Sequence, residues 1–404
     1  MSKKILVSGA SIAGPTLAFW LSRYGFEVTV VERAPSLRLG GQNIDITGHA
    51  QTIVQKMGVE EAILEANTGE RGLLFVNKFN NVKAAFPKDS SATFTRELEI
   101  LRGDLVEILY EHTKSDVTYL FDDFITDLKE NESDMTVTFE SGEVENFSLV
   151  IAADGFRSKA RQLVFGDEVK FNFLNLYMAY LTIPKAPTDV QWARWYNAPG
   201  GKVTLIRPDN KGTTRACFAF WSDDEKYSHL NRAQQKEVLR EKLQNAGWET
   251  PRIAKSIDGG SEEVYFDTIS QVKAPHWSKG RFAMVGDAAY CPTPLTGMGT
   301  SLAIIGAYVL AGELARHEDH KQAFDAYEKL MRPYVESIQQ LPPGSPRLVY
   351  PKSKVGVVLL NRIAGIAASR PAKKLFKYLG SHKKEDEGKD EDFVLPDYPA
   401  LCKA

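Results

Sequence analysis

The sequence KILVSGASIAGPTLAFWLSRYGFEVTVVER, residues 4–33, determines the architecture more than any other part of the chain. Lys4 to Val7 is almost continuously apolar, as is typical of a strand buried on both faces of a parallel sheet. After a glycine-containing turn, the pattern predicts a helix from Pro15 to Tyr24 and a second strand from Glu27 to Val31. Strand, helix and strand in this order predict the first β-α-β unit of an α/β protein.

The turn inside this unit has the spacing of a dinucleotide-binding fingerprint. Gly9 allows the tight turn and Gly14 lets the helix pack close to the strand, whereas Ser11 replaces the middle glycine and adds a hydrogen-bond donor. We expect a pyrophosphate at the start of the helix and ribose hydroxyls at Glu32, whose carboxylate would repel a 2′-phosphate and so disfavours NADP there. The predicted contacts are Gly9, Ser11, Ile12, Ala13, Gly14, Glu32 and Arg33.

Two further strands end at an acid and a glycine, and we call each such strand end a corner. Ser148–Ala152 leads to Asp154 and Gly155, and Phe282–Val285 leads to Gly286 and Asp287. Ligands of α/β proteins lie at the carboxyl ends of strands, so the corners predict one shared site. One such corner alone could be an ordinary strand-loop-helix unit. After Asp287, a loop opens a long apolar helix and aims backbone N–H groups forward. Its predicted contacts are Pro294, Gly297, Met298, Gly299 and Thr300.

Three residues outside the corners are also candidates for ligand contact. Gly41 and Gln42 precede a short strand, so backbone there could approach a ligand, with a hairpin turn as the alternative. Arg102 stands just before a helix that runs to about Lys114. It could reach a phosphate or a ring edge, and a surface salt bridge is the alternative.

The middle of the chain, from about Phe171 to Ile269, alternates with period two and is rich in aromatic residues. This pattern predicts an antiparallel sheet with one free face, a candidate floor for a substrate. Arg207, Arg215 and Phe220 are its candidate substrate contacts, although about half of the aromatic residues could simply be core. The remaining expectations are a helix at 52–65, strands at 73–76 and 82–86, a meander of strands at 117–120, 125–130 and 135–139, and helices at 322–340 and 355–379.

Composition excludes several other classes of protein. The 404 residues carry a formal net charge of −2, and 43% are hydrophobic, so nothing indicates nucleic acid or a membrane as partner. Cys217, Cys291 and Cys402 are widely spaced, which argues against a disulfide framework or a metal site and favours a cytoplasmic location. No coiled-coil repeat is present, so a monomer is expected.

The order and spacing of the corners over about residues 3–340 resemble those of class A FAD-dependent aromatic monooxygenases with the para-hydroxybenzoate hydroxylase fold. The segments Gly40–Ile46, Glu99–Leu105 and Gly286–Pro292 are most similar to the Tet(X)-type tetracycline-inactivating enzymes and polyketide hydroxylases. The resemblance implies that Asp287 binds the ribityl chain of FAD and that Arg102 contacts the flavin. Asp154 and Gly155, completed by Ser158 and Arg161, would serve both FAD and NAD(P)H. Tyr290 departs from the histidine that many members have.

The resemblance also implies an α/β fold, with a Rossmann-like FAD-binding domain, an inserted antiparallel-sheet substrate domain and a C-terminal helix. The expected FAD-binding parts are 1–71, 98–170 and 271–340, the substrate parts are 72–97 and 171–270, and the C-terminal helix and tail are 341–404. NAD(P)H would reduce a non-covalently bound flavin, and molecular oxygen would form a C4a-hydroperoxide that hydroxylates a phenolic or polycyclic substrate. No side chain is identified as catalytic with certainty.

Other functions of the same fold remain open at this point. A halogenase would carry a Trp-x-Trp-x-Ile-Pro segment, and the spacing of Trp192 and Trp195 does not match it. A reductase needing no oxygen, or a non-catalytic FAD-containing drug-binding protein, would fit part of the pattern. The intact acids Asp154 and Asp287 argue against the non-catalytic alternative.

Overall fold

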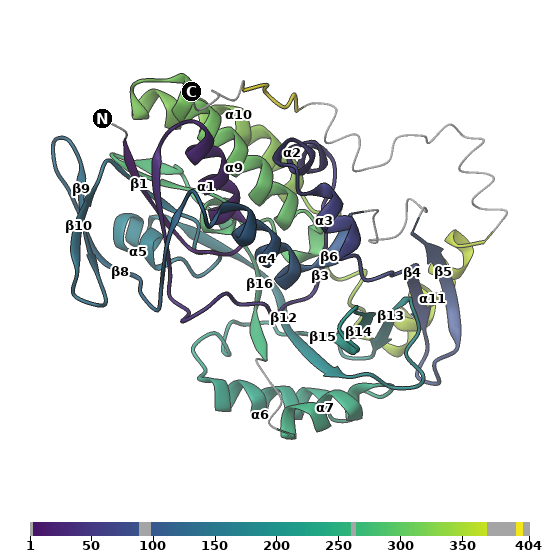
Figure 1. Ribbon diagram of the computed structural model, residues 1–404. Coiled ribbons are helices and arrows are strands. Elements are labelled where there is room, and N and C mark those ends of the chain that lie inside the picture. The colour runs from purple at the N-terminus through teal and green to yellow at the C-terminus, as the bar shows by residue number, and fades with distance from the viewer. Residues whose placement is uncertain (1–2, 89–97, 260–263, 370–392, 399–404) are drawn as a thin grey trace.

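The computed structural model describes residues 3–88, 98–259, 264–369 and 393–398. Two large sheets dominate the molecule (Figure 1), a six-stranded sheet in the α/β part and a seven-stranded sheet beside it. The predicted fold class, an α/β cofactor domain with an inserted antiparallel sheet and a C-terminal helix, is confirmed. We keep the predicted domain boundaries as a proposal. Residues 89–97, part of the second predicted segment, lie outside the described residues.

The six-stranded sheet has the order β17-β18-β11-β1-β2-β7 and is parallel except for β17. The centre of this sheet is shielded from solvent, because Ile5, Leu6 and Val7 of β1 are fully buried. This explains the continuous apolar run, since helices or other strands cover both faces. The strands are β1 (Lys4–Ser8), β2 (Glu27–Glu32), β7 (Thr118–Phe121), β11 (Leu149–Ala152), β17 (Ser278–Lys279) and β18 (Phe282–Met284).

Among the helices of this α/β part are the following five, of which α1, α9 and α10 stack together beside the sheet (Figure 1). Helix α9 is buried along almost its whole length, in keeping with its small and apolar composition. These helices are α1 (Ala13–Arg23), α4 (Arg102–Thr113), α5 (Lys159–Phe165), α9 (Gly299–Arg316) and α10 (His320–Gln339). Two short strands, β3 (Asn43–Asp45) and β6 (Glu99–Leu101), pair nearby.

Three predictions of local structure were wrong. The strand predicted at 117–120 is β7, which pairs with β2 in the parallel sheet and not with the meander. The meander instead contains β8 (Ile125–Glu130), β9 (Met135–Phe139) and β10 (Val144–Phe147), the last of which we did not predict. The helix predicted at 52–65 is two helices, α2 (His49–Met57) and α3 (Glu60–Glu65), because Gly58 adopts a φ of +76° and ends the first.

The seven-stranded sheet has the order β16-β12-β15-β14-β13-β4-β5. One face packs against α6 (Arg232–Leu243) and α7 (Thr250–Asp258), and the other carries a second apolar cluster that includes residues of α11 (Lys354–Ala367). The strands are β4 (Gly72–Val76), β5 (Val82–Pro87), β12 (Lys170–Pro184), β13 (Ala193–Ala198), β14 (Lys202–Pro208), β15 (Thr213–Trp221) and β16 (Tyr265–Lys273). The sheet therefore joins two segments that lie far apart in the sequence.

The end of the chain is described only in part. Helix α11 matches the start of the predicted C-terminal helix, and residues 370–379 of that prediction lie outside the described residues, as does Cys402. Among the described residues, no helix is both long and apolar enough to cross a membrane.

Candidate functional site

The three corners lie at one edge of the six-stranded sheet, where β1, β11 and β18 end side by side. Ser8 of β1 pairs with Ala152 of β11, and Ala152 pairs with Met284 of β18. Close packing at the first corner requires a glycine. A Cβ on Gly9, whose φ is +108°, would lie 2.6 Å from the carbonyl oxygen of Ala153. The three corners therefore lie at adjacent strand ends, and that they form one shared site stays a prediction.

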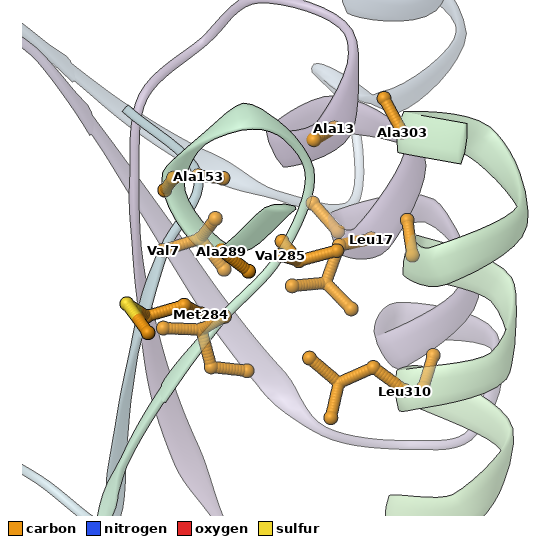
Figure 2. Packing of buried hydrophobic residues seen from close by; sticks show 14 of the residues in the cluster. Val7, Ala13, Leu17, Ala153, Met284, Val285, Ala289, Ala303 and Leu310 are labelled. Atoms are coloured by element: carbon orange, nitrogen blue, oxygen red, sulfur yellow. The ribbon is translucent and has the colours of Figure 1, made fainter. Parts of the chain in front are cut away.

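Helices α1 and α9 both begin at this edge, and small residues let them approach the third corner. An added Cβ on Gly286 would lie 3.1 Å from the Cβ of Ala13 and 3.7 Å from that of Ala303. Figure 2 shows Ala13 and Ala303 facing each other where the two helices start. Gly14 is more restricted, because its Cβ would lie 1.9 Å from the carbonyl oxygen of Gly9. The glycines thus bring two helix N-termini to the strand ends.

Both helix starts present backbone N–H groups without a competing side chain. Ile12 stands at the N-cap of α1 and Met298 at the N-cap of α9, and neither helix has a side-chain cap or an acid in its first turn. Unsatisfied N–H groups and the positive end of the helix dipole favour an anion or an electron-rich group. The sequence predicted this arrangement for both helices.

Glu32 closes the first corner from the second strand. One carboxylate oxygen accepts from the N–H of Ala10 at 2.9 Å, and the other accepts from the N–H of Ala34 at 3.1 Å. Arg38 lies 3.5 Å from the same carboxylate, whereas Arg33 is exposed and lies over the ring of Phe124. The carboxylate is therefore fixed in orientation at the end of β2, while Arg33 points to another part of the surface.

Asp154 holds the second corner together by capping α5. It accepts from the hydroxyl of Ser158 at 2.5 Å and from the N–H of Lys159 at 3.0 Å. Burial raises the pKa of this carboxyl, and these hydrogen bonds partly oppose the shift. Arg161, which is buried, donates to the carbonyl of Phe156 at 2.8 Å and to the carbonyl of Ala288 at 2.9 Å. This arginine ties the second corner to the third.

Asp287 begins the short helix α8 (Asp287–Tyr290) at the third corner. Burial raises its pKa from the ordinary 3.8 to about 6, and a hydrogen bond with Cys291 opposes the shift. The loop that follows contains Pro294, exposed, and Gly297, which has a φ of +68° and no described residue within 4 Å of an added Cβ. Gly299 and Thr300 then open α9. The loop is therefore open around Gly297, and Oδ1 of Asp287 lies 3.9 Å from the position of an added Cβ on Gly299.

Arg102 and Arg215 hold the segment around Gly41 from opposite sides. Arg102 donates to the hydroxyl of Ser11 at 3.0 Å and also to the carbonyl of Gly40. Arg215 donates to the carbonyl of Gly41 at 3.2 Å, and Gln42 donates to the carbonyl of Ala216 at 3.3 Å. Arg102 thus donates both to a neighbouring hydroxyl and to backbone carbonyls.

Arg207 lies directly opposite Arg215 on the neighbouring strand, so both arginines lie on the same face of the seven-stranded sheet. Arg207 is buried and donates to both oxygens of Glu70, at 2.7 and 2.9 Å, and to the carbonyl of Asn43 at 3.1 Å. These bonds join the sheet to β3 and occupy the guanidinium. They give Arg207 a structural role, which corrects the expectation of a substrate contact.

Phe220 lies on the wrong face for the predicted substrate contact. It stacks on Tyr177 and Phe266 in the apolar cluster beneath α6 and α7. The prediction ignored strand parity, because side chains of β15 alternate between faces and Arg215 is an odd number of residues away. Phe220 therefore belongs to the core.

The opposite face of the same strand faces the third corner. Leu295, from the loop after Asp287, packs against the cluster that contains Leu205, Cys217 and Tyr180. Leu205, Cys217 and Tyr180 were not among the predicted contacts. The period-two pattern that placed Arg215 outward could have identified Cys217 two residues later.

Two cavities among the described residues lie outside the predicted contacts, and Tyr290 of α8 lines the first of them. One of about 320 Å³ is lined by Trp277, Arg332 and Gln339, and one of about 400 Å³ by Trp192 and Asp189. No predicted contact residue lines either cavity.

Comparisons with known proteins agree with the geometry. Residues 2–341 match the family described as FAD binding domain. A flavin-dependent monooxygenase from an unknown prokaryotic organism is 39% identical over 346 residues, 84% of this chain and 88% of the relative. Monooxygenase CTB7 of Cercospora beticola is 37% identical over 381 residues, 89% of this chain and 91% of the relative. Among solved structures, the tetracycline destructase Tet(51) is similar with a TM-score of 0.80 at 33% identity, over 99% of this chain and 100% of that one. The chain therefore belongs to the FAD-binding-domain family of class A flavin-dependent monooxygenases, as the resemblance in its motifs predicted.

Proposed function

We propose that FAD lies extended across the three corners, with its pyrophosphate at the start of α1. The residues present fit this cofactor. Gly9 and Gly14 bring the backbone of the turn close to β11, and the first turn of α1 carries no acid. Gly155, with a φ of +83°, has no described residue within 4 Å of an added Cβ, so the backbone of the second corner is open to a ligand. Glu32 is placed to accept from the adenosine ribose.

The ribityl chain and the ring system would then rest on the third corner. Asp287 would accept from ribityl hydroxyls, because its Oδ1 lies near the start of α9, 3.9 Å from the position of an added Cβ on Gly299. The start of α9 at Gly299 and Thr300 would stabilise negative charge on the pyrimidine side of the ring, as an oxyanion hole does. Arg102 and the backbone of Gly41 and Gln42 would border the ring from the other side.

We further propose that an aromatic, polycyclic substrate binds between this loop and the seven-stranded sheet. The face is apolar, because Leu205 and Leu295 both pack against the cluster that contains Cys217. Its polar groups are few, which suits a flat ligand that needs orientation more than charge. The half-buried Tyr180 is the candidate for holding a substrate oxygen. Arg215, the candidate from the sequence, already pairs with Asp209 at 3.1 Å and donates to the hydroxyl of Thr182 at 2.6 Å. The tetracycline destructases among the structural neighbours support a polycyclic phenol as the substrate class.

The reaction we propose inserts one atom of O2 into an aromatic C–H bond and reduces the other atom to water with two electrons from NAD(P)H and a proton. FAD, when bound, supplies the electron transfer and the activation of oxygen, and the protein supplies orientation and a dry surface. NADH and NADPH remain equal candidates as donor. Inactivation of an antibiotic and a cytoplasmic location stay predictions.

The convergence of three glycine and acid corners on two uncapped helix starts is the observation that carries this proposal. The test is NADH and NADPH oxidation by the purified protein with tetracyclines, anthraquinones and simple phenols. We expect a yellow protein whose NAD(P)H oxidation rises with a polycyclic phenol and whose product gains one oxygen atom. Oxidation of NAD(P)H with no oxygenated product from any of these compounds would contradict hydroxylation and favour a reductase.

A further inference from the structure

Helix α11 carries an apolar stripe on its outer surface. Five residues at helical spacing are between 51% and 77% exposed, namely Val355, Val358, Leu359, Ile363 and Ile366. An amphipathic helix normally turns such a stripe toward the protein. A contiguous exposed patch of this kind, in contrast to scattered apolar residues, marks a surface that binds something.

The inner side of the same helix is already occupied. Ala364 is buried in the cluster that also contains Tyr350 and Cys217, and Gly365 lies so close to β5 that an added Cβ would be 3.0 Å from the carbonyl oxygen of Lys83. The helix is therefore anchored in one rotational setting by its small residues. The outer stripe cannot turn inward without breaking this contact.

The charge around the stripe has a single sign. Lys354 and Arg362 lie on the exposed part of α11, and neither forms an ion pair with a described residue. Lys352, two residues before the start of α11, is paired with Asp223 at 3.0 Å. Helix α11 itself contains no aspartate or glutamate. Beyond the helix, the sequence is basic up to Lys384 and then largely acidic from Glu385 to Asp392. The overall net charge of −2 hides this local excess.

We propose that the outer face of α11 docks on an anionic lipid surface. A helix with an apolar stripe and flanking cations lies in the plane of a bilayer interface, with the stripe among the acyl chains and the cations at the headgroups. This mode needs no spanning helix. The composition did not predict a membrane contact, because it gives only the average charge of the whole chain. The proposal does not depend on the identity of the substrate.

The position of α11 gives this contact a functional consequence. The helix packs by its inner side against the apolar face of the seven-stranded sheet that Leu295 also contacts. A lipophilic substrate dissolved in the bilayer would then be one helix away from the face on which we propose that it binds. In Figure 1, α11 lies at the end of the molecule opposite the meander β8–β10.

The test is co-sedimentation of the full-length, FAD-loaded protein with vesicles of phosphatidylcholine alone or mixed with phosphatidylglycerol. We expect binding to the mixed vesicles that weakens with added salt. Val358→Asp and Ile363→Asp should each weaken it about tenfold, since each removes a branched aliphatic group from the interface. Lys354→Glu should weaken it roughly tenfold on mixed vesicles only. Val144→Asp, an exposed residue of β10 at the opposite end, is the matched control and should change nothing.

Three results would overturn the proposal. The first is no sedimentation with either vesicle, which would mean that the face is covered by the chain itself. The second is equal binding to neutral and anionic vesicles. The third is a dimer in light scattering that Val358→Asp and Ile363→Asp convert to a monomer, because the occupant would then be a second copy. Unchanged circular dichroism and FAD content of the variants show that they are folded.

Discussion

Gly14→Ala tests the first corner by adding a single methyl group. The new Cβ would lie 1.9 Å from the carbonyl oxygen of Gly9, about 1.1 Å inside the shortest contact that such atoms make, near 3.0 Å. Because the atom it meets is backbone, the start of α1 must move away from β1 by about 1 Å. Such overpacking costs about 1–3 kcal/mol of folding free energy, partly offset because alanine favours helix more than glycine.

The same displacement moves the N–H groups of Ile12 and Ala13 away from the proposed pyrophosphate. Loss of one to two hydrogen bonds to a charged group costs about 3 kcal/mol, a decrease in FAD affinity of roughly 100-fold. Quenching of FAD fluorescence on titration of cofactor-free protein measures the affinity, and urea unfolding measures the stability. Gly259→Ala is the control, because its Cβ would meet nothing nearer than 3.4 Å. Wild-type FAD affinity in Gly14→Ala would refute the assignment of the pyrophosphate to the start of α1.

Three further substitutions separate structural from ligand-binding roles. Arg207→Met removes the two hydrogen bonds that the buried Glu70 carboxylate accepts from the guanidinium and should lower the free energy of unfolding by about 3–5 kcal/mol in chemical denaturation. An unchanged free energy of unfolding with a raised KM would restore a substrate role for Arg207. Phe220→Ala should cost about 3–5 kcal/mol by the same measurement while the KM of the folded fraction stays unchanged. Burial raises the pKa of Asp287 from 3.8 to about 6, so ionisation of this carboxyl destabilises the cofactor-free fold. The free energy of unfolding should therefore fall as the pH rises from about 3.8 through about 6. Ribityl hydroxyls donate to the ionised form, so FAD affinity should rise over the same interval in the wild type and stay flat in Asp287→Asn; equal pH profiles would place the ribityl chain elsewhere.

Local sequence signals predicted the corners because each depends on a few adjacent residues. A buried strand, a glycine with positive φ and an acid follow one another at Gly286 and Asp287, and the same logic applies to Gly9 and Glu32 across one β-α-β unit. The position of each corner at a strand end, and the family, could therefore be inferred from the sequence.

Pairing between strands and between side chains far apart in the chain could not be predicted from the sequence. The partner of β7 is β2, almost 90 residues earlier, and no pattern in residues 117–120 distinguishes this from a meander. The bond between Arg207 and Glu70 joins residues 137 positions apart, and only the fold shows that the arginine is occupied. The prediction for Phe220 failed for a different reason. The alternation of side chains along β15 already assigns Phe220 to the face opposite Arg215.

The most direct test of the central claim is mass spectrometry of the product formed under isotopically labelled oxygen. The FAD-loaded protein, NAD(P)H and a polycyclic phenol such as tetracycline are incubated under ¹⁸O2 in ordinary water. Our account predicts a product that carries one oxygen atom from ¹⁸O2, with NAD(P)H consumed in equal amount. A product whose added oxygen comes from water, or a substrate recovered unchanged while NAD(P)H is consumed, would contradict it.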